Sequence, residues 1–199
     1  MYDEPQMNKY TLNPELLHAA YSQGYFPMPD SDTGEILWFR PDPRAVIPLD
    51  GFHISRSLRR TLNKQHYEIT RDKSFQDVVL GCASHPNTWI NQEIIDVYGQ
   101  MFNIGLAHSV EVWFNGSLVG GTYGLCLGGA FFAESKFHRM RDASKVALYH
   151  LVQHLRLSGF SLLECQFLTP HLKSLGAMEI TDMEYIAQLN QALKFSPEF

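Results

Sequence analysis

The sequence contains few cysteines and no long apolar run. Its 199 residues include three cysteines, none of them in a C-x-x-C motif. A disulfide framework needs paired cysteines and a zinc site needs closely spaced ligands, so neither is predicted. No apolar stretch approaches the ~20 residues that cross a bilayer, and the N-terminus lacks the basic start and apolar core of a signal peptide. We therefore expect a cytoplasmic protein with no membrane segment and no metal site.

Positive charge is also scarce. The 16 Lys and Arg residues face 21 Asp and Glu, which gives a formal net charge of −5. Proteins that bind a long duplex through its phosphates are usually basic, so this class is disfavoured, whereas contact with one end of a nucleic acid through a local patch is not. The signatures G-x-x-x-x-G-K-S/T, G-x-G-x-x-G, G-x-S-x-G and H-E-x-x-H are absent too. Nucleotide-driven, hydrolase and zinc chemistries are thereby disfavoured.

Helical and strand-like segments alternate along the chain, and hairpins interrupt the alternation. Hydrophobic residues make up 45% of the sequence, which is enough for a full core. This pattern predicts an α+β fold with a mixed, mostly antiparallel sheet flanked by helices. We expect a small N-terminal lobe over residues 1–65 and a larger domain over residues 66–199, although no clean linker separates them. Residues 1–12 are polar and are expected to form an arm.

The central part of the chain has the highest density of glycine. Asn115-Gly116 predicts a tight hairpin that leads into a strand over residues 118–125, and a third strand follows over residues 130–134. Glycine inside a strand, as at Gly124, indicates a β-bulge or a place where a ligand meets bare backbone. Asp142 is predicted to cap the helix that comes next.

Three polar residues occupy positions where apolar residues are expected. Side chains alternate along a strand, so Glu164 and Gln166 would share one face of a strand over residues 160–167. A carboxylate and an amide on a core strand are unfavourable unless they are partnered. Either this face of the strand lies in water, or the two side chains form a site together with Glu134, which ends an apolar run beside the glycine-rich hairpin.

Three other features each allow two interpretations. Arg56, Arg59 and Arg60 lie close together on one predicted helix. They form either an ordinary solvent-exposed face or a binding site for phosphates. Trp89 precedes a helix cap and either plugs the core or stacks on a base. The proline-stiffened loop over residues 25–29 contains Met28, and this loop is either a packing lid or a platform for a ligand.

As a set, these segments resemble the leucyl/phenylalanyl-tRNA–protein transferases, bacterial enzymes that append Leu or Phe to protein N-termini. The resemblance covers about residues 13–180. It is carried by eight blocks in the same order: GYFPM, WFRPDPRAVIPLDGFHISRSLRR, TWI, AHSVEVW, LVGGTYGLCLGGAFFAESKF, ASKVAL, LLECQ and HLKSLGA. The C-terminal part of this family resembles the GNAT acyltransferase fold, which implies a GNAT-like core here.

The resemblance implies the substrates. The donor would be an aminoacyl-tRNA that carries Leu, Phe or Met, and the acceptor a protein that begins with Lys or Arg. The product would be marked for degradation. Because the donor is an activated ester, no cofactor, ATP or metal is expected, and we expect a monomer.

The resemblance also implies roles for single residues. Glu164 and Gln166 fall on the catalytic block, with Glu in place of the usual Asp. Glu134 falls near the acceptor or the aminoacyl group, while Trp89 and Met28 fall on two tryptophans that cover the terminal adenosine. Lys136 and His138 replace the usual Met and Ser.

An apolar pocket is needed for the transferred side chain. We expect Leu151, Leu155 and Leu163 to line it, with Thr122 at its mouth. Two other functions stay open: an acetyl-CoA-dependent N-acetyltransferase of the GNAT type, and a non-catalytic module that binds N-degrons. The first should show a pyrophosphate-binding glycine loop, which residues 139–143 lack.

Overall fold

The computed structural model of the chain describes residues 12–30, 33–85 and 88–199. The arm predicted over residues 1–12 lies outside the described residues, apart from Leu12. The helices are α1 (Pro14–Ser22), α2 (Arg56–Asn63), α3 (Phe75–Ala83), α4 (Gln92–Asn103), α5 (Ala143–Ser158), α6 (Pro170–Lys173) and α7 (Asp182–Ala192). The strands are β1 (Phe26–Pro29), β2 (Ile36–Phe39), β3 (Arg44–Val46), β4 (Glu68–Arg71), β5 (Ala107–Phe114), β6 (Ser117–Leu127), β7 (Ala130–His138), β8 (Leu162–Glu164) and β9 (Met178–Ile180).

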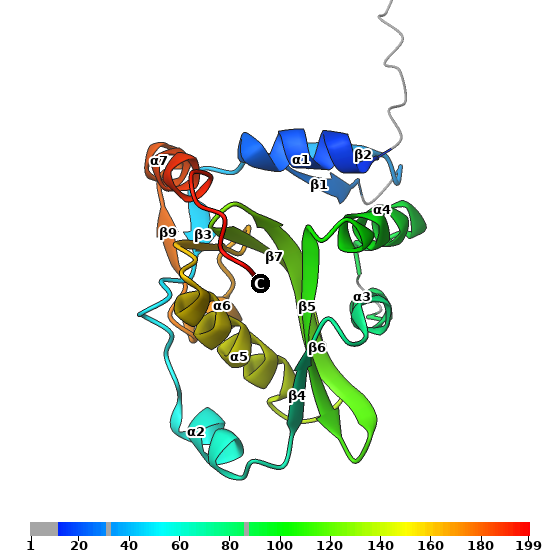
Figure 1. Ribbon diagram of the computed structural model, residues 1–199, viewed down its shortest axis with the longest axis vertical. Coiled ribbons are helices and arrows are strands. Elements are labelled where there is room, and N and C mark those ends of the chain that lie inside the picture. Colours follow the sequence, from blue (N-terminus) through cyan, green and yellow to red (C-terminus); the bar gives the residue numbers. More distant parts are fainter. Residues whose placement is uncertain (1–11, 31–32, 86–87) are drawn as a thin grey trace, which may run out of the picture.

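A seven-stranded sheet forms the centre of the molecule, with the strand order β4-β5-β6-β7-β8-β3-β9 (Figure 1). Its neighbouring strands are antiparallel except for the parallel pair β7 and β8. The predicted α+β fold with a mixed, mostly antiparallel sheet is therefore confirmed. Among the described residues, no helix has the length and apolar character needed to cross a membrane.

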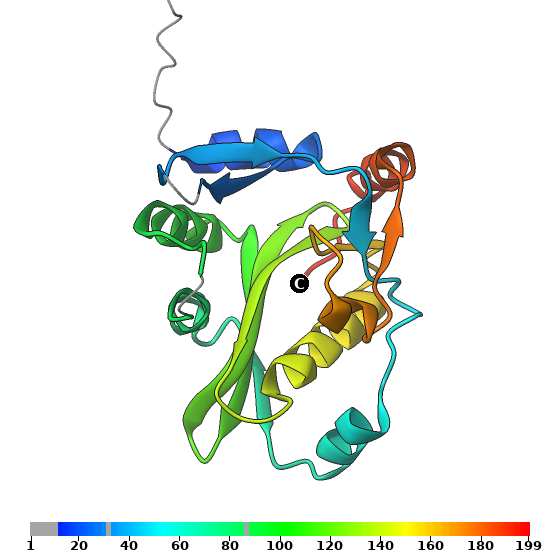
Figure 2. The same ribbon diagram turned by 180° about the vertical axis from the view of Figure 1, so that it is seen from behind.

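Helices cover both faces of this sheet. Figure 1 shows α3 and α4 on one face and α5 on the other, and Figure 2 shows the same layers from behind. One apolar core includes Val78, Tyr98 and Phe132, between the sheet and the helices α3 and α4. A second core includes Leu58, Leu151 and Phe131, between the sheet and the helices α2 and α5.

The N-terminal segment contributes to two parts of the fold. A proline-stiffened loop is predicted over residues 25–29, but β1 occupies it and pairs with β2 in a separate two-stranded sheet. Its prolines are tolerated because a two-stranded sheet leaves one edge of each strand unpaired. A lobe is expected over residues 1–65, whereas β3 lies inside the large sheet between β8 and β9. The N-terminal segment thus supplies a strand of the sheet that carries the site.

A β-bulge in the hairpin of β6 and β7 sets the direction of Glu134. Tyr123 pairs with Ser135 and Gly124 pairs with Ala133, so Glu134 has no partner on β6. A Cβ atom at Gly124 would collide with the carbonyl oxygen of Phe132 and the ring of Phe131, which is why glycine is required there. The bulge predicted from Gly124 is confirmed, and a bulge re-aims the side chain of its extra residue.

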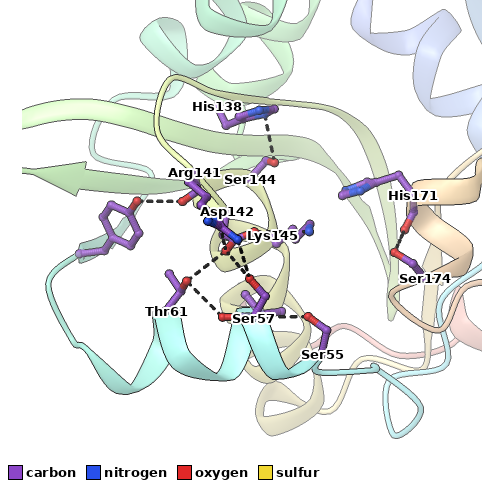
Figure 3. A network of polar contacts seen from close by, with 12 residues as sticks. Ser55, Ser57, Thr61, His138, Arg141, Asp142, Ser144, Lys145, His171 and Ser174 are labelled. Atoms are coloured by element: carbon purple, nitrogen blue, oxygen red, sulfur yellow. Dashed lines mark hydrogen bonds and ion pairs between the residues drawn. The ribbon is translucent and has the colours of Figure 1, made fainter.

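The start of α5 differs from the prediction. The helix begins after Asp142 as expected, but Asp142 has a φ of 61° and its side chain makes no capping hydrogen bond. Its carboxylate instead accepts from the Thr61 hydroxyl at 3.1 Å and lies 3.4 Å from the Lys145 ammonium. Asp142 therefore joins the start of α5 to α2 (Figure 3).

Candidate active site

An apolar cavity of about 210 Å³ opens beside the bulge. Its apolar wall includes Ile47, Leu148 and Leu172, from the segment after β3, from α5 and from α6. Glu134 and Gln166 supply polar atoms to the same cavity. An engineered apolar cavity of about 150 Å³ holds benzene, so this one has room for a leucine or phenylalanine side chain.

Glu134 is held by hydrogen bonds from three directions. Its Oε1 accepts from the Tyr21 hydroxyl at 2.6 Å, and its Oε2 accepts from the Gln166 amide nitrogen at 2.9 Å. The Tyr21 hydroxyl is also 2.6 Å from that of Tyr98. Since α1, α4 and the segment after β8 all converge on this carboxyl group, its position depends on the packing of the whole fold.

Burial controls the protonation of Glu134. Desolvation raises the pKa of its carboxyl to about 8, and the nearby Glu164 acts in the same direction. The hydrogen bonds from Tyr21, Tyr98 and Gln166 oppose this shift because they stabilise the ionised form. A carboxyl that titrates near neutral pH in a cavity is a candidate for binding a cation or moving a proton.

Gln166 does not lie in a regular strand. β8 ends at Glu164, and Gln166 has a φ of 63°, which breaks the alternation predicted for residues 160–167. As a result Cys165, Gln166 and Phe167 all line the cavity, although opposite faces are expected. The Gln166 amide nitrogen donates to Glu134, so its carbonyl oxygen remains as the acceptor of this side chain.

Glu164 lies behind this residue rather than in the cavity wall. Its Oε1 accepts from the backbone N–H of Gln166 at 2.5 Å and from Nη1 of Arg44 at 2.9 Å. Glu164 is fully buried, and it is absent from the residues that line the cavity. Burial raises the pKa of its carboxyl, and the charge of Arg44 opposes this shift. The expected placement of Glu164 and Gln166 on one face of a strand is therefore wrong.

The leucines expected in the pocket lie deeper. Leu151, Leu155 and Leu163 belong to the core between α5 and the sheet, and none of them lines the cavity. Leu148, one turn earlier on α5, takes this place. The 3.6-residue period identifies the buried side of α5, but it does not tell which turn faces the cavity. Thr122 does line the cavity, and its hydroxyl donates to the Ser135 carbonyl at 2.9 Å.

Trp89 and Met28 lie on the rim of the same cavity. Both residues line it, both are partly buried, and both pack against the core. Both residues therefore pack against the core, and contact with a ligand stays a prediction that their place in the cavity wall supports. The exposed ring of Phe167 adds a third large side chain there.

The three arginines of α2 face solvent. Arg56, Arg59 and Arg60 are exposed, while Ser57 and Thr61 on the opposite side of the helix bond to Asp142 (Figure 3). None of the three arginines lines the cavity. The contact with Asp142 nevertheless fixes their helix beside the start of α5.

Comparison with known proteins gives the family. The family described as "Leucyl/phenylalanyl-tRNA protein transferase" matches residues 46–190, and the N-terminal domain of the same family matches residues 10–42. The chain is 51% identical over 189 residues to a leucyl/phenylalanyl-tRNA–protein transferase of Herpetosiphon aurantiacus, covering 94% of this chain and 98% of that protein. It is 50% identical over 190 residues to one from a Ruegeria species, covering 95% and 90%.

Among solved structures, the chain is similar to FemX, with a TM-score of 0.55 and 9% identity over 86% of this chain and 68% of that one. The family matches define the protein as an enzyme that transfers an aminoacyl group, and its mixed sheet flanked by helices has the fold of FemX. The chain belongs to the leucyl/phenylalanyl-tRNA protein transferase family.

Three residues that organise the site are missed by the sequence interpretation. Tyr21 and Tyr98 hold Glu134, and Arg44 pairs with Glu164. Tyr21 occupies an ordinary position of an amphipathic helix, and Arg44 lies in a proline-rich segment. No local signal marks either residue, because their partners are 113 and 120 positions away.

Proposed function

We propose that the protein transfers leucine, and also phenylalanine and methionine, from aminoacyl-tRNA to the N-terminal α-amine of proteins that begin with Lys or Arg. The product is an N-degron that marks the acceptor for proteolysis. The observation that carries this proposal is the hydrogen bond of 2.9 Å between Gln166 and Glu134 in the wall of an apolar cavity. This arrangement provides an acceptor for an amine next to a pocket for an aminoacyl side chain.

The reaction needs positioning and the movement of one proton. The neutral α-amine attacks the ester carbonyl carbon, the C–N bond forms, and the ester C–O bond to the terminal ribose breaks. The proton of the amine ends on the ribose oxygen that leaves. Holding the amine and the ester together can lower the barrier by roughly 7–11 kcal/mol. No metal or ATP enters this scheme, because the ester is already activated.

Gln166 and Glu164 have separate roles in this scheme. The carbonyl oxygen of Gln166 accepts a hydrogen bond from the attacking amine, and its amide nitrogen stays on Glu134. Glu164 holds the backbone of Gln166 in its left-handed conformation, so it is a positioning residue. Glu164 is fully buried and does not line the cavity, so it acts on the amine only through Gln166.

One assay tests the function directly. The protein is incubated with labelled Leu-tRNA and a peptide that begins with Arg, and the expected result is label in the peptide. The same peptide with an acetylated α-amine serves as the control and should stay unlabelled. Acetylation of the peptide from acetyl-CoA would instead indicate an N-acetyltransferase. Binding of the peptide without transfer would indicate a non-catalytic binding module.

Glu134→Gln is expected to weaken the preference for a cationic first residue about 10–100-fold in kcat/KM, because a charge-assisted hydrogen bond is removed. The effect depends on pH. The pKa of Glu134 is raised to about 8, so the wild type gains charge on this carboxyl as the pH rises through 8. For a peptide that begins with Arg, the ratio of wild-type to variant kcat/KM should rise over the same pH range. A peptide that begins with Ala is the comparison, and its ratio should not rise.

The raised pKa of Glu134 also predicts how the stability of the protein depends on pH, which gives an independent control. Because the carboxyl of Glu134 has a pKa of about 8 in the folded protein against an ordinary value of 4.5, the folded state binds more protons between these values. Its contribution to stability therefore falls as the pH rises from about 4.5 to 8. Denaturant titrations should show Glu134→Gln gaining stability relative to wild type over this window. An unchanged Lys/Arg preference in a stable variant would contradict the role in acceptor binding.

The exposed face of α2 should contact the acceptor-stem phosphates of tRNA. Replacing Arg56, Arg59 and Arg60 together by Gln is expected to raise the KM for Leu-tRNA. The slope of log affinity against log salt concentration should become less steep by about 0.9 for each phosphate that is no longer neutralised. The matched control replaces Lys73, Arg156 and Lys194 by Gln, since these cations are also exposed. Equal salt slopes for the two triple variants would exclude a specific phosphate seat on α2.

A further inference from the structure

A second, more polar cavity adjoins the first. It has a volume of about 510 Å³ and shares Trp89, Ser135 and Lys136 with the apolar cavity. Its other walls include His138 at the end of β7 and His171 on α6. A ligand whose reacting group lies beside Gln166 can therefore extend past Trp89 and Lys136 into this second space.

Lys136 is a cation without a counterion at the boundary of the two cavities. It is partly buried, and no described carboxylate makes an ion pair with it. Nearby Lys145 differs, because its ammonium lies 3.4 Å from Asp142. Desolvation lowers the pKa of Lys136, so the site disfavours this charge until an anion enters. An unpaired lysine in a cavity of an acidic protein is suited to an anionic ligand.

Other side chains with nitrogen donors line the same space, namely His138, Arg139 and His171. Burial lowers the pKa of His171, and the charges of Lys136, Lys145 and His138 lower it further, which places these four groups near one another. Figure 3 shows Ser144 next to His138, and His171 on another side of the start of α5. The Ser144 hydroxyl lies 3.4 Å from the His138 ring. The cavity is thus surrounded by hydrogen-bond donors contributed by β7, α5 and α6.

We propose that this second cavity binds a phosphodiester of the donor's single-stranded 3′ end, with Lys136 as its main charge and His138 and His171 as donors. The inference rests on the proposed function, because it requires a donor joined to RNA. The position agrees with the chemistry of the 3′ end. The phosphate of the terminal nucleotide lies one nucleoside away from the ester, and Trp89 lies on the wall between the two cavities.

The phosphate contact adds to the charge of α2. It lies within the cavities, so it acts on the reacting end of the donor rather than on the body of the tRNA. Coenzyme A also carries phosphates, and the test has to separate the two sources.

The test uses an unreactive probe, the trinucleotide CCA with leucine attached through a 3′-amide. A second probe carries an uncharged methylphosphonate in its last linkage. Lys136→Met is expected to weaken binding of the first probe about 10–100-fold, since it removes a charge-assisted hydrogen bond to phosphate. The wild-type protein should bind the uncharged probe more weakly than the charged probe by a similar factor. The Lys136→Met variant should bind the two probes with nearly the same affinity. Lys194→Met, which removes an exposed lysine, is the control and should bind both probes like wild type.

Three results would overturn the proposal. Lys136→Met could bind the charged probe as tightly as wild type, or it could weaken the uncharged probe by the same factor as the charged one. Alternatively, coenzyme A could bind in a Lys136-dependent manner while binding of CCA does not depend on Lys136. Transfer from full-length Leu-tRNA by wild type is measured separately, so failure of the phosphate site is distinguished from failure of the proposed function.

Discussion

Replacing Arg44 by methionine is expected to lower the free energy of unfolding by about 3–5 kcal/mol. Arg44 is 1% exposed and pairs with the fully buried Glu164 at 2.9 Å. Its guanidinium also donates to the Gly24 carbonyl and lies between the rings of Phe26 and Tyr185, at 5.0 and 4.4 Å from their centroids. The variant leaves a buried carboxylate without a counterion. The resulting destabilisation is a large fraction of the ~5–15 kcal/mol stability of an ordinary domain.

The pH dependence and two further variants test this explanation. Burial already raises the pKa of Glu164 above its ordinary value of 4.5, and loss of Arg44 should raise it further. The destabilisation should therefore shrink as the pH falls from the pKa of Glu164 in the variant towards its pKa in the wild type, because below both values the carboxyl is protonated in both folded proteins. Adding Glu164→Gln to Arg44→Met should restore most of the stability, because no buried charge remains.

Arg40→Met is the matched control for Arg44. Arg40 also pairs with a carboxylate, Asp182, but the two side chains are 31% and 27% exposed. Exposed pairs contribute about 0–1 kcal/mol, so this variant should unfold almost like wild type. Equal losses for Arg40→Met and Arg44→Met in denaturant titrations would show that burial of the pair is not the cause.

The largest effect on activity is expected for Gln166→Ala, a decrease of about 10²-fold in kcat, because the group that orients the attacking amine is lost. The amide of Gln166 is fixed by its hydrogen bond to Glu134, so its carbonyl oxygen is oriented before the amine arrives. Single-turnover transfer from Leu-tRNA to an Arg peptide measures the loss. The KM for Leu-tRNA should change little, because the proposed contacts with the RNA do not involve Gln166.

Two controls accompany Gln166→Ala. Gln188→Ala removes an exposed amide on α7 and should leave transfer unchanged. Gln166→Asn keeps a residue that tolerates positive φ but shortens the side chain, so it should fold like wild type and still transfer slowly. Near-normal rates in both Gln166→Ala and Glu164→Gln would remove this pair from the mechanism.

Local signals in the sequence predict much of the fold. Asn115-Gly116 forms the tight turn between β5 and β6, and Thr181 forms a capping box with Glu184, as the pattern T-x-x-E indicates. Gly124 marks the bulge that aims Glu134. In each case the signal and the structure lie within a few residues of each other, or in adjacent strands of one hairpin. Backbone preferences suffice to specify such features.

The parts that the sequence interpretation misses depend on long-range packing. Alternation fails after β8 because Glu164 bonds the backbone N–H of Gln166 and stabilises a positive φ there. The choice between Leu148 and Leu151 for the cavity depends on where α6 meets α5, and helical periodicity contains no such information. Arg44 and Tyr21 reach the site only after distant segments have folded together.

The position of β3 between β8 and β9 has a consequence for biosynthesis. The ribosome releases residues 44–46 more than a hundred residues before either neighbouring strand exists. During that interval both edges of β3 lack hydrogen-bond partners, and such edges can pair with other chains. The hydrogen bond between Arg44 and Glu164 also cannot form until β8 has been synthesised. A nascent chain stalled before β9 would therefore contain every residue that lines the apolar cavity, and yet it would remain prone to aggregation.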